Sequence, residues 1–267
     1  MTPPQDRDPL PSYVQDLPPL PAEYWDAIHD GIGSIALGTG GDEGDPVSEA
    51  QLEVIADQVR LLLAWNASIN LSGIRAPDAI AVEHVLDSLT ALPILRRAGV
   101  DEFLDIGSGG GYPGLPLAVA LPARRALLVE SVGKKARFLA TAAEAIGIND
   151  RVAIAATRAE TLAGDPRHRG HWQAVTARAV AEMSEVVEIA LPLQRVGGLL
   201  VAWKRRPAED ELARADGAIT QLRGRLIRLE PVTVPGLEDH VLAVVQKIAE
   251  TPPKFPRDPA LRRRRPL

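Results

Sequence analysis

The chain has 267 residues, of which 46% are hydrophobic and 24% charged, and a net charge of −5. This length can bury one sizeable core with a small appendage. Cysteine is absent, so disulfides, thiolate metal sites, iron–sulfur clusters and cysteine nucleophiles are excluded. No apolar run is long enough to cross a bilayer, and the opening residues lack the pattern of a secretory signal. We therefore expect a cytoplasmic protein without a membrane segment.

The charge is unevenly distributed. Residues 1–60 contain 12 acidic and two basic side chains, whereas the other 207 residues contain 23 acidic and 28 basic ones. The last 17 residues contain six basic side chains and only one acid, Asp258. Such a basic end suits a polyanion, although a solvated, disordered tail has the same composition.

The first third of the chain predicts a small helical unit, residues 21–98, without strand patterns. Residues 1–20 are rich in proline and acid, so we expect them to be disordered. Ser48 and Gln51 have the spacing of a capping box, and a flexible loop is expected over 38–46. Apolar periodicity predicts three helices, near residues 21–35, 48–63 and 77–90.

From residue 102 short apolar runs alternate with amphipathic helices. Seven strands are predicted, near residues 102–106, 125–130, 151–156, 172–177, 197–203, 226–234 and 240–247. Five helices are predicted, near residues 113–121, 134–146, 158–163, 182–191 and 207–222. The alternation predicts an α/β fold with a mostly parallel sheet, and the short connection 235–239 makes the last strand antiparallel. This is the layout of Rossmann-like class I methyltransferases. We assign residues 99–250 to that domain and 251–267 to a basic C-terminal tail.

The first strand of this domain ends in a glycine-rich stretch. Asp105 is followed by five glycines within residues 107–114, at the place where a doubly wound sheet binds its ligand. A glycine-rich loop that merely connects strand and helix is the alternative interpretation.

The details of this turn favour S-adenosylmethionine (SAM). Tyr112 occupies the position of the third glycine of a dinucleotide fingerprint, and the lysine of a phosphate loop is absent. A carboxylate at Asp105 would repel a pyrophosphate but suits the positively charged amino acid end of SAM. We therefore predict cofactor contacts at Asp105, Gly107, Gly109 and Tyr112.

Two further acids follow strands. Glu130 ends the second strand, 23 residues after Gly107, where a carboxylate can accept hydrogen bonds from both ribose hydroxyls of SAM or of NAD. Glu160 follows the third strand, where an adenine edge would lie. Taken alone, Glu160 fits a helix-surface residue better, and only the series of strand-end acids favours a cofactor contact.

Arg178 ends the fourth strand beside the expected switch point. It can hold the cofactor carboxylate or steer the target group, and a salt bridge to Glu182 is the structural alternative. We identify no general base, and Arg178 is the best candidate for positioning. His84 and Asp87 are interpreted as a buried hydrogen-bonded pair that closes the helical unit over the pocket.

Basic residues outside the turn predict a surface that binds the phosphates of a polyanion. Phosphate contacts of this kind make binding depend steeply on salt, although solvated helix faces have similar composition. The predicted contacts are Lys134, Lys135, Lys204, Arg205, Lys254 and Arg257. His168 and His171 lie in a segment with a loop pattern, and we expect no metal site.

Six segments occur in the order typical of one known family. They are residues 65–72 (WNASINLS), 84–88 (HVLDS), 105–116 (DIGSGGGYPGLP), 130–139 (ESVGKKARFL), 176–179 (TARA) and 251–257 (TPPKFPR). On these motifs, residues 22–267 resemble the ribosomal small-subunit RNA methyltransferase G family. The resemblance implies a SAM-dependent enzyme that methylates N7 of a guanosine in 16S ribosomal RNA. Its partner would be that RNA or the small ribosomal subunit, and we expect a monomer.

The resemblance also implies particular contacts with the cofactor. They fall on Gly107, Tyr112, Glu130, Ser131, Val132, Ala159, Glu160 and Arg178. The chain departs from the family at Glu130 (usually Asp), Ala177 (usually Ser), Arg205 (usually Gly) and Ala67 (usually basic).

Guanine N7 carries a free lone pair, so its methylation requires alignment and exclusion of water more than a base. Cytosine-C5 methylation is excluded because it needs a cysteine nucleophile. Two other functions stay open: methylation of a small molecule or protein on the same fold, and RNA binding by a non-catalytic assembly factor.

Overall fold

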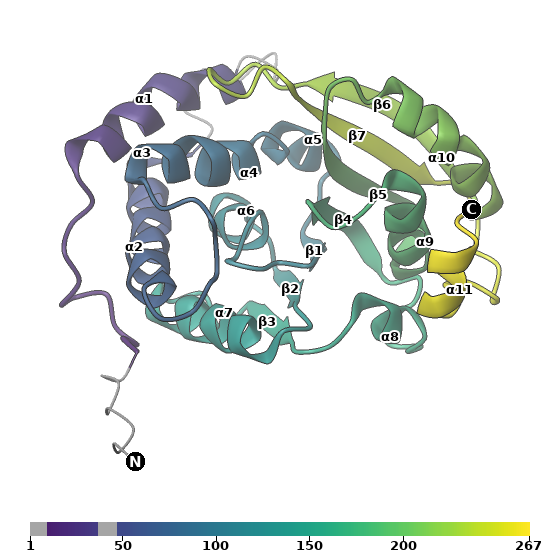
Figure 1. The fold of residues 1–267 in the computed structure, drawn as a ribbon, viewed down its shortest axis with the longest axis horizontal. Coiled ribbons are helices and arrows are strands. Elements are labelled where there is room, and N and C mark those ends of the chain that lie inside the picture. Colours follow the sequence, from purple (N-terminus) through teal and green to yellow (C-terminus); the bar gives the residue numbers. More distant parts are fainter. Residues whose placement is uncertain (1–9, 37–46) are drawn as a thin grey trace.

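A seven-stranded sheet forms the centre of the protein in the computed structural model, which describes residues 10–36 and 47–267 (Figure 1). The strands are β1 (Glu102–Ile106), β2 (Arg125–Val129), β3 (Val152–Ala155), β4 (Trp172–Arg178), β5 (Gln194–Arg205), β6 (Gly224–Pro231) and β7 (His240–Lys247). Their order is β3-β2-β1-β4-β5-β7-β6. Strands β1 to β5 are parallel, and β7 pairs antiparallel with both β5 and β6. The predicted Rossmann-like α/β fold with an antiparallel last strand is confirmed.

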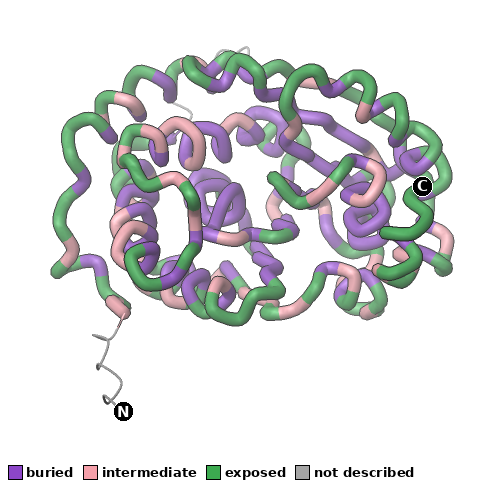
Figure 2. The backbone as a smooth tube through the Cα atoms, viewed as in Figure 1, coloured by how far each residue is buried: buried purple, intermediate pink, exposed green. Residues whose placement is uncertain are grey.

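Helices cover both faces of the sheet. One hydrophobic core joins one face to α1 (Ala22–Ala36), α2 (Glu49–Asn66), α3 (Pro77–Ile80), the π-helical turn η1 (Ala81–Leu86), α4 (Asp87–Leu89), α5 (Leu92–Arg97), α6 (Gly114–Ala120) and α7 (Gly133–Ala145). A second core joins the other face to α8 (Ala159–Ala163), α9 (Met183–Leu193) and α10 (Glu209–Gln221). Strands β1, β2, β4 and β7 are therefore mostly buried, as Figure 2 shows, which explains their apolar runs, whereas the edge strand β6 is largely exposed.

The helical unit shares its core with the sheet. Helix α2 begins at the predicted capping box, in which Ser48 and Gln51 satisfy each other's backbone amides. It packs against α6 and α7, so it lies directly behind the glycine-rich turn. The helical unit is thus packed against the sheet and its helices, beside the turn.

The prediction of disorder over residues 1–20 is wrong for residues 10–20. Val14 and Leu20 are buried in the first core. The Arg60 guanidinium on α2 donates to the carbonyls of Val14 (2.8 Å) and Pro18 (3.0 Å), and Trp65 Nε1 donates to the Pro11 carbonyl. Donors on a distant helix thus satisfy carbonyls of a proline-rich segment that forms no regular helix or strand. Residues 1–9 and the loop predicted at 38–46 lie outside the described residues.

The C-terminal segment folds back onto the second core. Phe255 is buried, and Arg169 donates to the carbonyls of Thr251, Pro252 and Phe255. A last helix, α11 (Pro259–Arg264), follows beside α9 (Figure 1). Within the described ranges, no helix has the length and apolar character that a membrane span requires.

Candidate cofactor and substrate site

The turn after β1 has a backbone that only glycine adopts easily. Gly107, Gly109 and Gly111 have φ angles of 69°, 56° and 97°. A Cβ atom on Gly111 would lie 2.5 Å from the Leu115 side chain. The amides of Gly107 and Ser108 both donate to the Val129 carbonyl, which fastens the turn to β2.

Asp105 supports the turn from behind. It is completely buried, and its Oδ1 accepts a hydrogen bond of 2.7 Å from the Thr176 hydroxyl. A Cβ atom on Gly114 would lie 2.8 Å from Asp105 Oδ2, so α6 begins directly against this carboxyl. Burial raises the pKa of Asp105 to about 6. The Asp105 side chain therefore points into the protein, and its contact with the cofactor amino group stays a prediction.

Glu130 links the turn to the end of β2. Its Oε2 accepts from the Gly109 amide (3.0 Å) and its Oε1 from the Val132 amide (2.7 Å). Each carboxylate oxygen keeps a further lone pair for a ligand donor. Glu130, which stands where the family usually has aspartate, is thus held in a fixed orientation by these two backbone amides.

The turn is bordered by apolar surface. Val132 and Val180 are two of the few large hydrophobic side chains that are exposed, at 42% and 36%. Val180 lies beside Gly107: a Cβ atom on Gly107 would be 3.2 Å from the Val180 side chain. Ser131 is exposed next to Val132. A glycine backbone, an oriented carboxylate and flanking valines fit a ligand with a ribose and an apolar body, as SAM has.

Tyr112 faces the helical unit. Its buried ring stacks on the His84 ring with centroids 4.5 Å apart, and the Arg178 guanidinium lies 5.7 Å from its centroid. Gln58 on α2 donates to the Gly110 carbonyl at 3.1 Å. A cofactor contact at position 112 would therefore involve the backbone, while the ring connects the turn to the neighbouring cavity.

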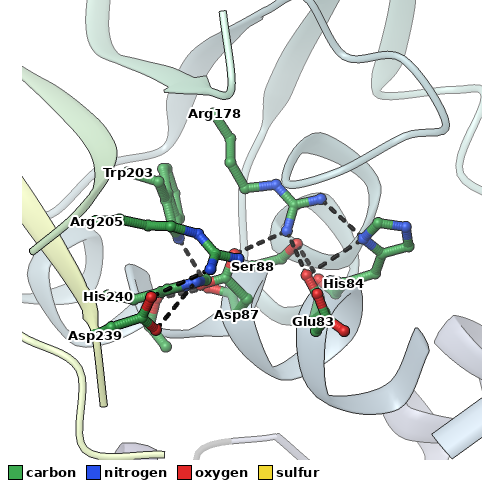
Figure 3. Close-up of polar contacts among 10 residues, drawn as sticks. Glu83, His84, Asp87, Ser88, Arg178, Trp203, Arg205, Asp239 and His240 are labelled. Atoms are coloured by element: carbon green, nitrogen blue, oxygen red, sulfur yellow. Dashed lines mark hydrogen bonds and ion pairs between the residues drawn. The ribbon is translucent and has the colours of Figure 1, made fainter. Parts of the chain in front are cut away.

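A cavity of about 360 Å³ opens beside the turn. It is lined by Ile74, Glu83, His84, Asp87, Arg178, Ala179, Trp203, Lys204, Arg205 and His240. Figure 3 shows Arg178 reaching from the end of β4 to the segment that carries Glu83, His84 and Asp87. Arg178 donates to Asp87 Oδ2 (2.8 Å), to the Glu83 carbonyl (2.8 Å) and to His84 Nδ1 (3.1 Å).

These bonds define the state of His84. Two groups contact Nδ1 of His84: the Arg178 guanidinium (3.1 Å), which only donates, and the Glu83 carbonyl (3.2 Å), which only accepts. The shorter contact with the charged donor favours a ring proton on Nε2, which lies 2.6 Å from the Ser72 hydroxyl. Burial and the Arg178 charge lower the pKa of His84 to about 4. His84 is therefore neutral at physiological pH.

The structure does not form the alternative salt bridge between Arg178 and Glu182 or the predicted direct pair of His84 and Asp87. Arg178 pairs with Asp87, whereas Glu182 lies 3.8 Å from Arg214. His84 and Asp87 are both bonded to Arg178. His240, at the start of β7, was missed in the sequence, and its Nδ1 lies 2.8 Å from Asp87 Oδ1. No local motif surrounds His240; only the pairing of β7 with β5 brings it to the cavity.

The remaining predicted cofactor residues, Ala159 and Glu160, begin α8. Ala159 is buried, and Glu160 forms an ion pair with Arg262 of α11. None of the described His, Asp and Glu side chains form a group of three arranged to hold a metal ion.

The predicted RNA-binding residues fall into two groups. Lys134 and Lys254 are exposed and Lys135 is half-buried at the start of α7. The others form ion pairs: Lys204 with Glu211 (2.6 Å), Arg205 with Asp239 (3.1 Å) and Arg257 with Glu188 (2.6 Å). Of these three, Arg205 has the most exposed side chain, at 65%.

Comparison with known proteins identifies the family of this chain. The model of the family "rRNA small subunit methyltransferase G" matches residues 51–235. The ribosomal RNA small subunit methyltransferase G of Roseiflexus sp. (strain RS-1) is 43% identical over 221 residues, covering 83% of this chain and 94% of the relative. The protein of that name from Streptococcus pyogenes serotype M12 is 34% identical over 229 residues, covering 85% and 95%.

Among solved structures, an O-methyltransferase from Bacillus cereus in complex with SAH aligns with a TM-score of 0.53 and 19% identity. The alignment covers 82% of this chain and 100% of that one, and it supports the fold alone. The family model and the curated relatives carry the assignment: the chain belongs to the rRNA small subunit methyltransferase G family.

Proposed function

We propose that the protein transfers the methyl group of SAM to N7 of a guanosine in 16S ribosomal RNA. It would act in the cytoplasm as a monomer, on the RNA or on the small ribosomal subunit. Family membership supports the reaction class and the kind of RNA. One structural observation supports the proposal most: the glycine-rich turn and the cavity at Arg178 lie side by side, joined by the Tyr112–His84 stack.

The cofactor would be held by the turn and the strand ends around it. Gly107 and Gly109 allow the ligand to approach the backbone, Glu130 would accept from the ribose hydroxyls, and Val132 would cover an apolar part. Ala159 and Glu160 would meet the adenine. SAM supplies an electrophilic methyl group on a sulfonium.

The cavity would receive the guanine base. The N7 lone pair needs no deprotonation, so the residues need only to orient the base and exclude water. The O6 oxygen beside N7 is an acceptor, and the Arg178 guanidinium suits it. Asp87, itself buried and bonded to His240, keeps Arg178 oriented. Neutral His84 supports Arg178 without adding a competing charge.

Basic side chains would hold the RNA backbone. Lys134, Lys135, Arg205 and Lys254 can reach phosphates from the surface. Lys204 and Arg257 were predicted as contacts as well, but each holds a carboxylate and is largely covered. The proposal therefore rests on the first four.

Calorimetry with the purified chain tests the cofactor half of the proposal. We expect SAM to bind in the micromolar range and NAD not to bind, and Glu130→Ala to weaken SAM binding because the ribose acceptor and the bond to Gly109 are lost together. The matched control is Glu144→Ala, which removes a carboxylate near the end of α7. Tight binding of NAD with no response to SAM would contradict the proposal.

A further inference from the structure

The C-terminal helix contacts the predicted adenine side of the cofactor site. Glu160 lies in the first turn of α8, after β3, and Arg262 lies in α11, 102 residues later. Nη2 of Arg262 donates to Glu160 Oε1 and lies 3.6 Å from Glu185 Oε1. The Arg262 side chain is only 4% exposed, in contrast to the exposed arginines that follow it. Unlike the exposed arginines of the tail, Arg262 is therefore buried against a specific partner, Glu160.

The position of Arg262 is fixed by the rest of the tail. Arg257 donates to both carboxylate oxygens of buried Glu188, at 2.8 and 2.6 Å, and to the Arg265 carbonyl at 2.8 Å. The Asp258 side chain caps α11 by accepting from the Ala260 amide. The helix is therefore held at both ends, and it presents Arg262 to α8 and α9.

Arg262 orients Glu160 and favours its charged form. Burial alone would raise the pKa of Glu160, but hydrogen bonds from its own backbone amide and from Arg262 outweigh this effect and lower it. The ion pair engages Oε1, and a carboxylate can accept a further donor at its other oxygen. The 6-amino group of adenine is such a donor.

We propose that Arg262 is a positioning residue for the cofactor, through which α11 holds Glu160 in the orientation that accepts the adenine amino group. The inference rests on the proposed function, because it requires SAM or its product S-adenosylhomocysteine (SAH) at this site. It gives the C-terminal segment a role in cofactor affinity that is separate from any contact of its exposed arginines with RNA.

The test compares two ligands that differ at the adenine edge. Calorimetry on the full chain measures the affinity for SAH and for S-inosylhomocysteine, in which an oxygen replaces the 6-amino group. Arg262→Ala should weaken SAH binding about tenfold, because a charged hydrogen bond is lost. It should change binding of S-inosylhomocysteine less than twofold. Arg264→Ala, an exposed arginine of the same helix, is the matched control and should change neither.

A double variant separates positioning from general damage. If Arg262 acts through Glu160, Arg262→Ala combined with Glu160→Gln should weaken SAH binding no more than Glu160→Gln alone. Equal losses for both ligands, additive losses in the double variant, or no loss at all would overturn the inference. Arg262→Gln, a shorter side chain that keeps a neutral donor, serves if the alanine variant does not fold. If the unaltered chain fails to bind SAH, the proposed function fails instead.

Discussion

Arg178 holds His84 and Asp87 together in the wall of the candidate substrate cavity. Arg178 donates to Asp87 Oδ2 and contacts His84 Nδ1, and its charge together with burial lowers the pKa of His84 to about 4, so the ring is neutral. Asp87 is 2% exposed, and its other oxygen is bonded to His240. Arg178, Asp87 and His240 thus form one chain of polar contacts along the cavity wall.

The low pKa of His84 predicts a measurable loss of protein stability in acid. Its pKa is about 4 in the folded protein and near 6.5 in the unfolded chain. As pH falls through this window, protons bind to the unfolded chain first, so His84 lowers the free energy of unfolding by up to about 3 kcal/mol. Above pH 6.5 this penalty is absent. Urea unfolding at pH 7 and pH 4.5 should therefore show a smaller acid loss for His84→Gln than for the unaltered chain.

An exposed histidine provides the control for this measurement. His29 lies at the surface of α1, and His29→Gln should keep the full acid loss. The same pH dependence in His84→Gln as in the unaltered chain would contradict the assigned state of His84.

At the scale of elements, the conformation of the glycine-rich turn requires residues without a Cβ atom. Gly111→Ala places a methyl group 2.5 Å from the Leu115 side chain, at a φ of 97°. We expect SAM binding to be lost and the melting temperature to fall, because α6 must move away from the turn. Calorimetry and thermal unfolding measure both effects.

Gly33→Ala is the matched change. Gly33 is exposed inside α1, with no atom near its missing Cβ. Alanine there should stabilise the protein by up to about 1 kcal/mol and leave SAM affinity unchanged. If Gly111→Ala behaved like Gly33→Ala, the turn would not be the cofactor site.

Elements with strong local signals could be predicted from the sequence. The apolar strands from residue 102, the Ser48 capping box and the glycines of the turn each follow from neighbours in the chain. Contacts between distant segments could not. His240 reaches Asp87, and Arg262 reaches Glu160, only through strand pairing and the path of the tail. Composition alone also could not reveal that Arg60 holds residues 14–18.

At the scale of the whole molecule, charge is expected to govern RNA binding. The described surface carries Lys134 and Lys135 at the start of α7, next to Glu130. If both contact phosphates, Lys134→Ala with Lys135→Ala should weaken binding of 16S ribosomal RNA and reduce the slope of log affinity against log salt by up to about 2. Filter binding at several salt concentrations measures this slope.

Charges on the far edge strand of the sheet provide the control. Arg225 and Arg228 lie on the edge strand β6, away from the turn in the strand order. Replacing both by alanine should leave the slope unchanged. Equal effects of the two pairs would mean that net charge alone, and no particular surface, drives the association.

Transfer of a methyl group to ribosomal RNA tests the central claim most directly. Small subunits or 16S ribosomal RNA without N7 methylation are incubated with the protein and SAM, treated with borohydride and aniline, and copied by reverse transcriptase. The account predicts one new stop, next to a single guanosine, which disappears with Glu130→Ala and is greatly reduced with Arg178→Ala. Methylation at another base or atom, or no transfer at any stage of subunit assembly, would contradict it.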